Sequence, residues 1–154
     1  MKAIIIYDSK YGNTMTVAET IAEGVRKECV EALVSEVSRI DLNKLAEYDA
    51  VLIGSPNHMG GPTRSIRSLI VKLNGLGLQG KAFAVFDTYM GGDVGKAVGK
   101  MERQMGEKAP GLKRVASGLS VRVQGMKGPV AEGELPRCSE FGRMIAVQLK
   151  SGAW

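Results

Sequence analysis

The stretch IIIYDSKYGNT, residues 4–14, changes from apolar to polar within one residue. Its three isoleucines and Tyr7 are typical of a buried strand, and hydroxyl, amide and small residues then crowd the loop from Ser9 to Thr14. A helix is expected to begin near Thr14, and the first N–H groups of a helix have no partner within it. The loop therefore predicts either an anion site at a helix N-terminus or a capped helix start, and by itself it favours neither.

Apolar runs of the same kind recur along the chain, with helical patterns between them. The predicted strands are residues 3–7, 32–37, 50–54, 82–86 and 115–123. Apolar residues spaced three and four apart predict the core faces of four helices, namely Ala18, Ile21, Ala22 and Val25; Ile66, Leu69, Ile70 and Leu73; Val94, Ala97, Val98 and Met101; and, in a helix over 135–150, Phe141, Met144, Ile145 and Leu149. The stretch 39–49 fits neither pattern. Alternating strands and helices predict an α/β fold with three layers, α/β/α, around a five-stranded parallel sheet.

The composition excludes several classes of protein. The 154 residues suit one domain, and no apolar run approaches the ~20 residues of a membrane helix. The apolar run after Lys2 is too short for a signal peptide, so we expect a cytoplasmic protein. Cys29 and Cys138 form no CxxC pair, which argues against a metal site. The formal charge is +5, but the basic residues are scattered without aromatic residues between them, which argues against nucleic-acid binding.

Three loops of unusual composition follow predicted strands. They are DSKYGNT (residues 8–14), SPNHMGGPT (residues 55–63) and DTYMGGD (residues 87–93). In open parallel sheets, ligands bind outside the carboxyl ends of the strands. We therefore expect these loops to form one binding site.

The run from Ile5 to Ala18 resembles, position by position, the N-terminal signature of the flavodoxins. GSPNHMGG resembles the second flavin loop of that family, especially in the flavodoxin-type domains attached to diiron oxidases, and FDTYMGG and EFGRMIA resemble its third loop and last helix. The run from Ile5 to Ala18 contains no GxGxxG and no Lys-Ser/Thr ending of a P-loop, which argues against a dinucleotide or nucleoside-triphosphate site there, and Ser55 and Pro56 stand where a receiver domain needs a carboxylate. The resemblance implies that the sheet has strand order 2-1-3-4-5 and that the protein is a short-chain member of the family. It also implies that the cofactor is FMN.

The resemblance also implies which residues contact FMN. The phosphate would be surrounded by Ser9, Lys10, Tyr11, Gly12, Asn13 and Thr14. One side of the isoalloxazine ring would be lined by Pro56, Asn57, His58, Met59 and Gly60, and the other side by Thr88, Tyr89, Met90, Gly91 and Gly92. No Trp lies in the second loop, where many flavodoxins stack one on the flavin, and the only Trp is Trp154. His58, the only histidine, is either an idle loop residue or a group that tunes the flavin.

The function implied by this resemblance is electron transfer between redox enzymes, with the chemistry supplied by FMN and with no catalytic residue of the protein's own. The alternative is an NAD(P)H-dependent quinone or flavin reductase on the same fold, although such enzymes usually need extra loops. A third reading, a regulatory module without flavin, is disfavoured by the intact first loop. The excess positive charge, with Arg64 and Arg67 near the second loop, suggests acidic redox partners such as a ferredoxin.

Overall fold

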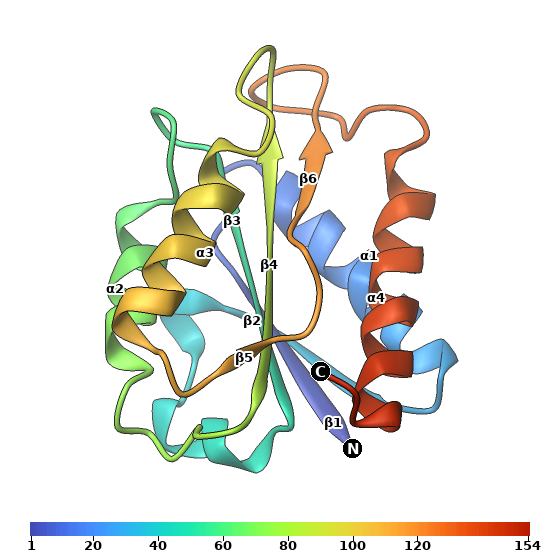
Figure 1. The fold of residues 1–154 in the computed structure, drawn as a ribbon. Helices are drawn as coiled ribbons and strands as arrows, with labels where there is room; N and C mark the ends of the chain where they lie inside the picture. Colours follow the sequence, from blue (N-terminus) through green and yellow to red (C-terminus); the bar gives the residue numbers. More distant parts are fainter.

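The computed structural model describes residues 1–154 and contains a parallel sheet with helices on both faces (Figure 1). The strands are β1 (Lys2–Tyr7), β2 (Glu31–Glu36), β3 (Ala50–Pro56), β4 (Ala82–Tyr89), β5 (Lys113–Arg114) and β6 (Leu119–Arg122). They run in the order β2-β1-β3-β4-β5, and β6 also pairs with β4. Every pairing is parallel, so the expected three-layer fold with strand order 2-1-3-4-5 is confirmed.

Four α-helices and two 3₁₀ helices connect the strands. They are α1 (Asn13–Lys27), α2 (Arg64–Lys72), α3 (Lys96–Lys108), α4 (Glu134–Ser151), η1 (Val37–Arg39) and η2 (Leu42–Glu47). In Figure 1, α1 and α4 cover one face of the sheet, and α2 and α3 cover the other. The stretch that fitted neither pattern contains η2, which buries Leu45 and is capped by the Asp41 carboxylate. None of the helices combines the length and the apolar character that a membrane span requires.

The sheet separates two apolar cores because successive side chains of a strand point to opposite faces. In β1, Ile5 belongs to the core under α1 and α4, whereas Ile4 and Ile6 belong to the core under α2 and α3. In register with Ile5, Val34 and Leu52 contact that first core from the neighbouring strands. A strand that is covered on both faces has apolar residues at successive positions. The apolar runs in the sequence therefore located β1, β3 and β4.

The fifth strand differs from the prediction of one run over 115–123. The structure has two short strands, β5 and β6, separated by a segment that contains Gly118. The N–H of Gly118 donates to the Glu102 carboxylate at 3.2 Å instead of to a strand partner. A Cβ at Gly118 would overlap the Val98 side chain, so the chain approaches α3 closely there. These contacts interrupt the ladder.

Two residues predicted to face the core are exposed. Val94 precedes α3, whose N-cap Gly95 has a φ of 76°, so the predicted helical face began too early. Met144 is 51% exposed although α4 forms where it was expected. The buried stripe of α4 is centred instead on Gly142, at which a Cβ would overlap the backbone of Ile21 in α1. This close approach turns Met144 towards solvent.

Candidate functional site

The first three loops meet at the carboxyl ends of β1, β3 and β4, together with the loop after β6 (Figure 1). They enclose a cavity of about 290 Å³. It is lined by Ser9, Lys10, Tyr11, Asn13, Thr14, Pro56, Asn57, His58, Thr88, Tyr89, Met90, Asp93, Val123 and Met126. Most residues of the predicted site are therefore together around one cavity, and the predicted residues outside its lining are Gly12, Met59, Gly60, Gly91 and Gly92.

The first loop leads into the N-terminus of α1, where the first backbone N–H groups of the helix have no side-chain partner. Gly12, the N-cap of α1, has a φ of 94°, and its N–H donates to the Ser9 hydroxyl at 2.9 Å. No side chain caps α1, so no carboxylate or hydroxyl occupies the N–H groups of its first turn. Backbone N–H groups and the helix dipole at such an end favour an anion. The helix start therefore has no side-chain cap, and the anion site at this loop stays a prediction.

The hydroxyl groups of Thr14 and Thr88 join this helix start to the end of β4. Their Oγ1 atoms are 3.1 Å apart, and both residues are buried although both line the cavity. The pair holds the first turn of α1 against the strand that leads into the third loop.

The second loop turns back on itself, which decides which of its residues face the cavity. His58 and Gly61 exchange two backbone hydrogen bonds, of 2.7 and 3.1 Å, across Met59 and Gly60. Both residues in the middle have positive φ values, 51° and 81°, as a type I′ turn requires. Met59 is consequently 92% exposed, while His58 lines the cavity.

The second and third loops are joined by a side-chain hydrogen bond. Asn57 Nδ2 donates to Asp93 Oδ2 at 3.0 Å, and Asp93 also forms an ion pair with Lys96 at 3.2 Å. The backbone N–H of Asn57 donates to the Thr88 carbonyl at 2.7 Å. Asn57 Oδ1 is buried and has no hydrogen-bond partner.

Three lining residues were missed by the sequence prediction. Asp93 closes the third loop, and its place at the end of DTYMGGD was a usable signal. Val123 and Met126 lie after β6, and the Tyr11 hydroxyl contacts Met126 Sδ at 3.6 Å. The rule that ligands lie outside the strand ends applies to the last strand as well, and the Gly and Pro residues after it mark a loop.

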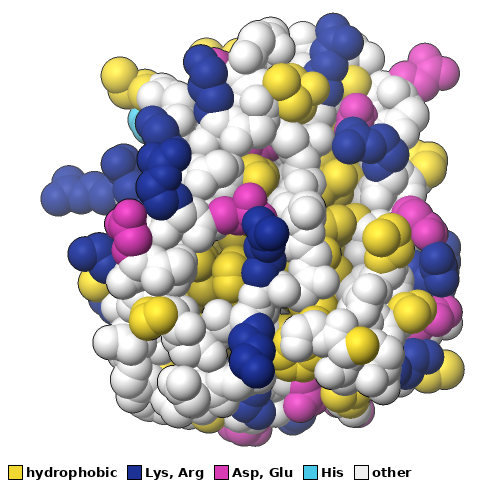
Figure 2. Space-filling view, in the orientation of Figure 1, with side chains coloured by type: hydrophobic (Ala, Val, Ile, Leu, Met, Phe, Trp, Pro, Cys, Tyr) yellow, Lys and Arg dark blue, Asp and Glu magenta, His cyan; other side chains and the backbone are white.

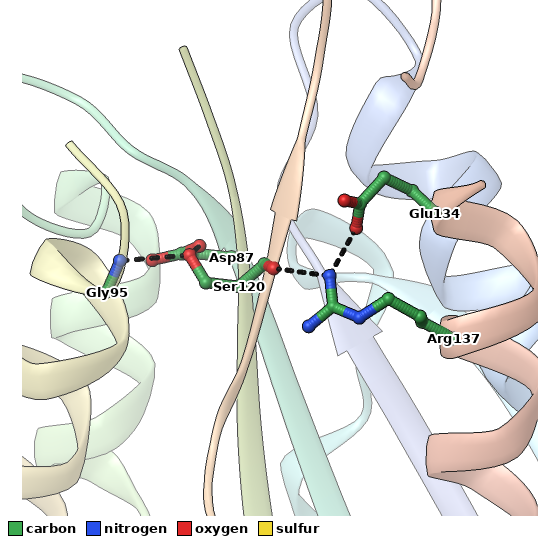
Figure 3. Close-up of polar contacts among 5 residues, drawn as sticks. All are labelled: Asp87, Gly95, Ser120, Glu134 and Arg137. Carbon is green, nitrogen blue, oxygen red and sulfur yellow. Dashed lines mark hydrogen bonds and ion pairs between the residues drawn. The ribbon is translucent and has the colours of Figure 1, made fainter. Parts of the chain in front are cut away.

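Behind the third loop, Asp87 anchors several elements (Figure 3). Its carboxylate accepts from the N–H of Val98 at 3.0 Å. It also accepts from the Ser120 hydroxyl, which in turn accepts from the N–H of Gly95 at 3.0 Å (Figure 3). Arg137 of α4, paired with Glu134, donates to the Ser120 carbonyl at 3.4 Å. Burial raises the pKa of the Asp87 carboxyl above its usual range, and these hydrogen bonds oppose that shift. The network ties β4, β6, α3 and α4 together below the cavity.

Comparisons with known proteins agree with this geometry. The family model for flavodoxin matches residues 5–133. The coenzyme F420H(2) oxidase of Methanothermobacter marburgensis is 32% identical over 97% of this chain and 36% of its own length, and an NAD(P)H dehydrogenase (quinone) of Chromohalobacter salexigens is 31% identical over 52% of this chain and 51% of its own. The chain thus spans about half the length of these relatives or less. A solved flavodoxin from the domain Archaea has a TM-score of 0.85 and 27% identity, with 97% of this chain and 99% of that chain covered. The chain belongs to the flavodoxin family.

Proposed function

We propose that the protein binds FMN in the cavity described above and transfers electrons between redox enzymes. The observation that carries the proposal is the composition of one cavity, which joins the free N-terminus of α1 to side chains from three further loops. Flavodoxins bind FMN, and the membership of this chain in that family supports the proposal. The protein's own residues then bind and orient the cofactor and limit its contact with water.

The residues present fit FMN at both ends. The first turn of α1 supplies N–H donors for a phosphate, and the Ser9 hydroxyl can add another. Apolar and aromatic side chains suited to a flat ring line the remaining wall, and they are Pro56, Tyr89, Met90, Val123 and Met126. Bound FMN would supply the one- and two-electron chemistry.

Apolar side chains around the cavity provide a place for a redox partner to approach. Tyr11, Met90 and Met126 line the cavity and also remain exposed, and Met59 projects from the neighbouring turn. Flexible methionine side chains adapt to different partner surfaces. We propose that the partner is an acidic redox protein because the chain carries a formal charge of +5.

The second candidate is an NAD(P)H-dependent quinone or flavin reductase. It is favoured by the similarity to NAD(P)H dehydrogenases (quinone), although that similarity covers only about half of this chain. A reductase must also hold a nicotinamide cofactor against the flavin, which a carrier does not need.

Anaerobic reduction distinguishes the two functions. The purified protein, saturated with FMN, should show flavin absorbance and should keep its oxidised spectrum after NADH or NADPH is added alone. Addition of a separate NADPH-dependent flavodoxin reductase should then bleach it. Rapid bleaching without that reductase would favour the second candidate, and failure to retain FMN would remove both.

A further inference from the structure

A groove with a volume of about 420 Å³ lies along α2, outside the site described above. Helix α2 lines it over two turns with Arg64, Ser65, Ser68, Leu69 and Lys72. The opposite wall belongs to the segment that links β2 to β3. Because α2 begins directly after the second loop, the groove starts beside the cofactor cavity and leads away from it (Figure 1). The groove and that cavity share no lining residue.

The charged residues that line this groove are all positive. They are Arg64 and Lys72, and neither of them forms an ion pair with a carboxylate of the protein. The acidic residues next to the opposite wall do not line the groove and have other partners. Glu36 accepts from the Ser38 hydroxyl at 2.7 Å, and Asp41 caps η2. The groove therefore offers two cations to an anionic ligand.

Apolar side chains separate the two cations. Leu69 lies between them on α2, and the opposite wall adds Val37, Ile40 and Leu42. The two cations are about 12 Å apart along the axis of α2, because a helix rises about 1.5 Å per residue. In an extended chain, residues i and i+4 are about 13 Å apart and point to the same side, with residue i+2 between them on that side. An extended segment can therefore place a carboxylate at each cation and an apolar side chain between them.

We propose that this groove docks an extended acidic segment of a partner protein, with two carboxylate residues four positions apart and an apolar residue midway. The groove is open along α2, because Arg64, Ser65, Ser68 and Lys72 are all exposed, which suits a chain laid along the helix rather than an enclosed small molecule. The two serine hydroxyls can bind backbone groups of such a segment. A partner held there would stand next to the cofactor cavity. Neither cation belongs to that cavity, so docking in the groove does not depend on FMN.

The test measures the binding of capped peptides, each carrying the same red fluorescent dye, to the FMN-saturated protein by fluorescence anisotropy. The matching probe is Thr-Glu-Thr-Leu-Thr-Glu-Thr, in which threonine favours an extended backbone. The permuted probe Thr-Thr-Glu-Glu-Leu-Thr-Thr has the same composition and charge, but its carboxylates cannot reach both cations. The matching probe should bind about tenfold more tightly than the permuted one at low salt. Replacing its leucine with asparagine should weaken it about tenfold, because the apolar contact is lost.

Variants of the protein show whether the peptide lies in the groove. Arg64→Gln and Lys72→Gln should each weaken the matching probe about fourfold at low salt, the effect of losing one exposed ion pair. The two positions are too far apart to interact, so the double variant should bind about fifteenfold more weakly than the wild type. Arg67→Gln is the matched control, because it removes the same charge from an exposed position of α2 that does not line the groove. It should keep the wild-type affinity within about twofold. Thermal unfolding of each variant checks that the fold is retained.

Equal affinity for the two probes, or no binding of either at millimolar concentration, would overturn the docking of an acidic segment. An equal loss in Arg64→Gln, Lys72→Gln and Arg67→Gln would also overturn it, because it would show attraction by general positive charge and no use of the groove. The same titrations with the apoprotein separate this inference from the proposed function. A protein that does not retain FMN but prefers the matching probe supports the groove and refutes the flavin site. A protein that retains FMN without this preference refutes the groove alone.

Discussion

At the scale of single residues, several polar side chains at the site make fewer hydrogen bonds within the protein than their groups allow. The Thr14 and Thr88 hydroxyls pair with each other, and the Asn57 amide is satisfied on one side only. The two hydroxyls have hydrogen-bonding capacity left for a ligand, because a hydroxyl has one donor and two acceptor positions. Substitutions at these positions should therefore change affinity more than they change folding.

Thr14→Val should weaken FMN binding about tenfold, the effect of losing about one hydrogen bond. Valine keeps the shape of the buried side chain, which is 1% exposed, while removing its hydroxyl. Thr20→Val is the control because Thr20 lies on the exposed face of α1 and bonds only to the Thr16 carbonyl. Fluorescence titration of both apoproteins measures the difference, and equal affinities would exclude a role for the Thr14 hydroxyl.

Asp87→Asn should change how stability depends on pH. Because burial raises the folded-state pKa of Asp87, the native protein binds its proton more readily than the unfolded chain does. The free energy of unfolding of the wild type therefore loses a contribution as the pH rises from about 4 through the folded-state pKa. Asparagine does not titrate, so the free energy of unfolding measured in urea should fall for the wild type relative to the variant over that pH range. A difference in unfolding free energy that does not change with pH would contradict this.

At the scale of elements, the position of α1 determines where its free N-terminus points. Helices α1 and α4 cross at glycines on both sides. A Cβ at Gly24 would overlap the Ser139 carbonyl, and a Cβ at Gly142 would overlap the Ile21 carbonyl. The two backbones are therefore in direct contact, and Cys138 is buried in the same layer, where burial raises its pKa to about 12.

Gly24→Ala and Gly142→Ala should each destabilise the protein by about 1–3 kcal/mol or more, because the obstructing atoms belong to backbone and cannot rotate away. Gly106→Ala in α3 is the matched control. No atom lies within 4 Å of its added Cβ, so alanine should instead stabilise by about 0.5–1 kcal/mol. Urea denaturation of the three variants measures both signs, and a neutral Gly142→Ala would mean that α4 moves easily on α1.

The N-terminus of α1 predicts a strong preference for the phosphorylated flavin. Riboflavin should bind about a hundredfold more weakly than FMN, or worse, because hydrogen bonds to a charged group contribute about 1.5–3 kcal/mol each. Calorimetric titration of the apoprotein with both flavins measures the ratio. Equal affinity would show that the first loop does not hold the phosphate.

At the scale of the whole molecule, the charge distribution concerns partners rather than the fold. The face in Figure 2 carries Lys and Arg side chains spread among carboxylates instead of one continuous patch. Arg64 and Arg67, both exposed, lie at the start of α2, and the preceding Thr63 donates to Asp8 of the first loop at 2.7 Å. These two arginines are therefore close to the loops that form the site.

Electron transfer to an acidic redox protein should slow as salt is added, since the Debye length falls from ~30 Å at 0.01 M to ~10 Å at 0.1 M. Replacing Arg64 and Arg67 with Gln should slow it at low salt and have little effect at high salt. A Lys44→Gln and Lys108→Gln double variant removes the same charge at the opposite end of the strands and should react like the wild type. Stopped-flow measurements decide this, and faster transfer to a basic partner at low salt would refute steering by these arginines.

Much of this molecule follows from local sequence patterns. The apolar runs of β1, β3 and β4 are continuous because both faces of those strands are covered, and the helical spacing of buried residues such as Ile66 and Ile70 is equally direct. The polar loops after the strands could be located for the same reason, since a parallel sheet brings its carboxyl ends together.

Contacts between distant segments decided the rest. The fifth strand is broken by Glu102 and Val98 of α3, which the run over 115–123 does not reveal. A turn closed by His58 and Gly61 directs Met59 outwards, although its neighbours line the cavity. The orientation of the Asn57 amide depends on Asp93, 36 positions later in the chain. Local spacing determines which face of a strand or helix a residue occupies, whereas the direction of a loop side chain depends on partners that only the folded chain brings within hydrogen-bond distance.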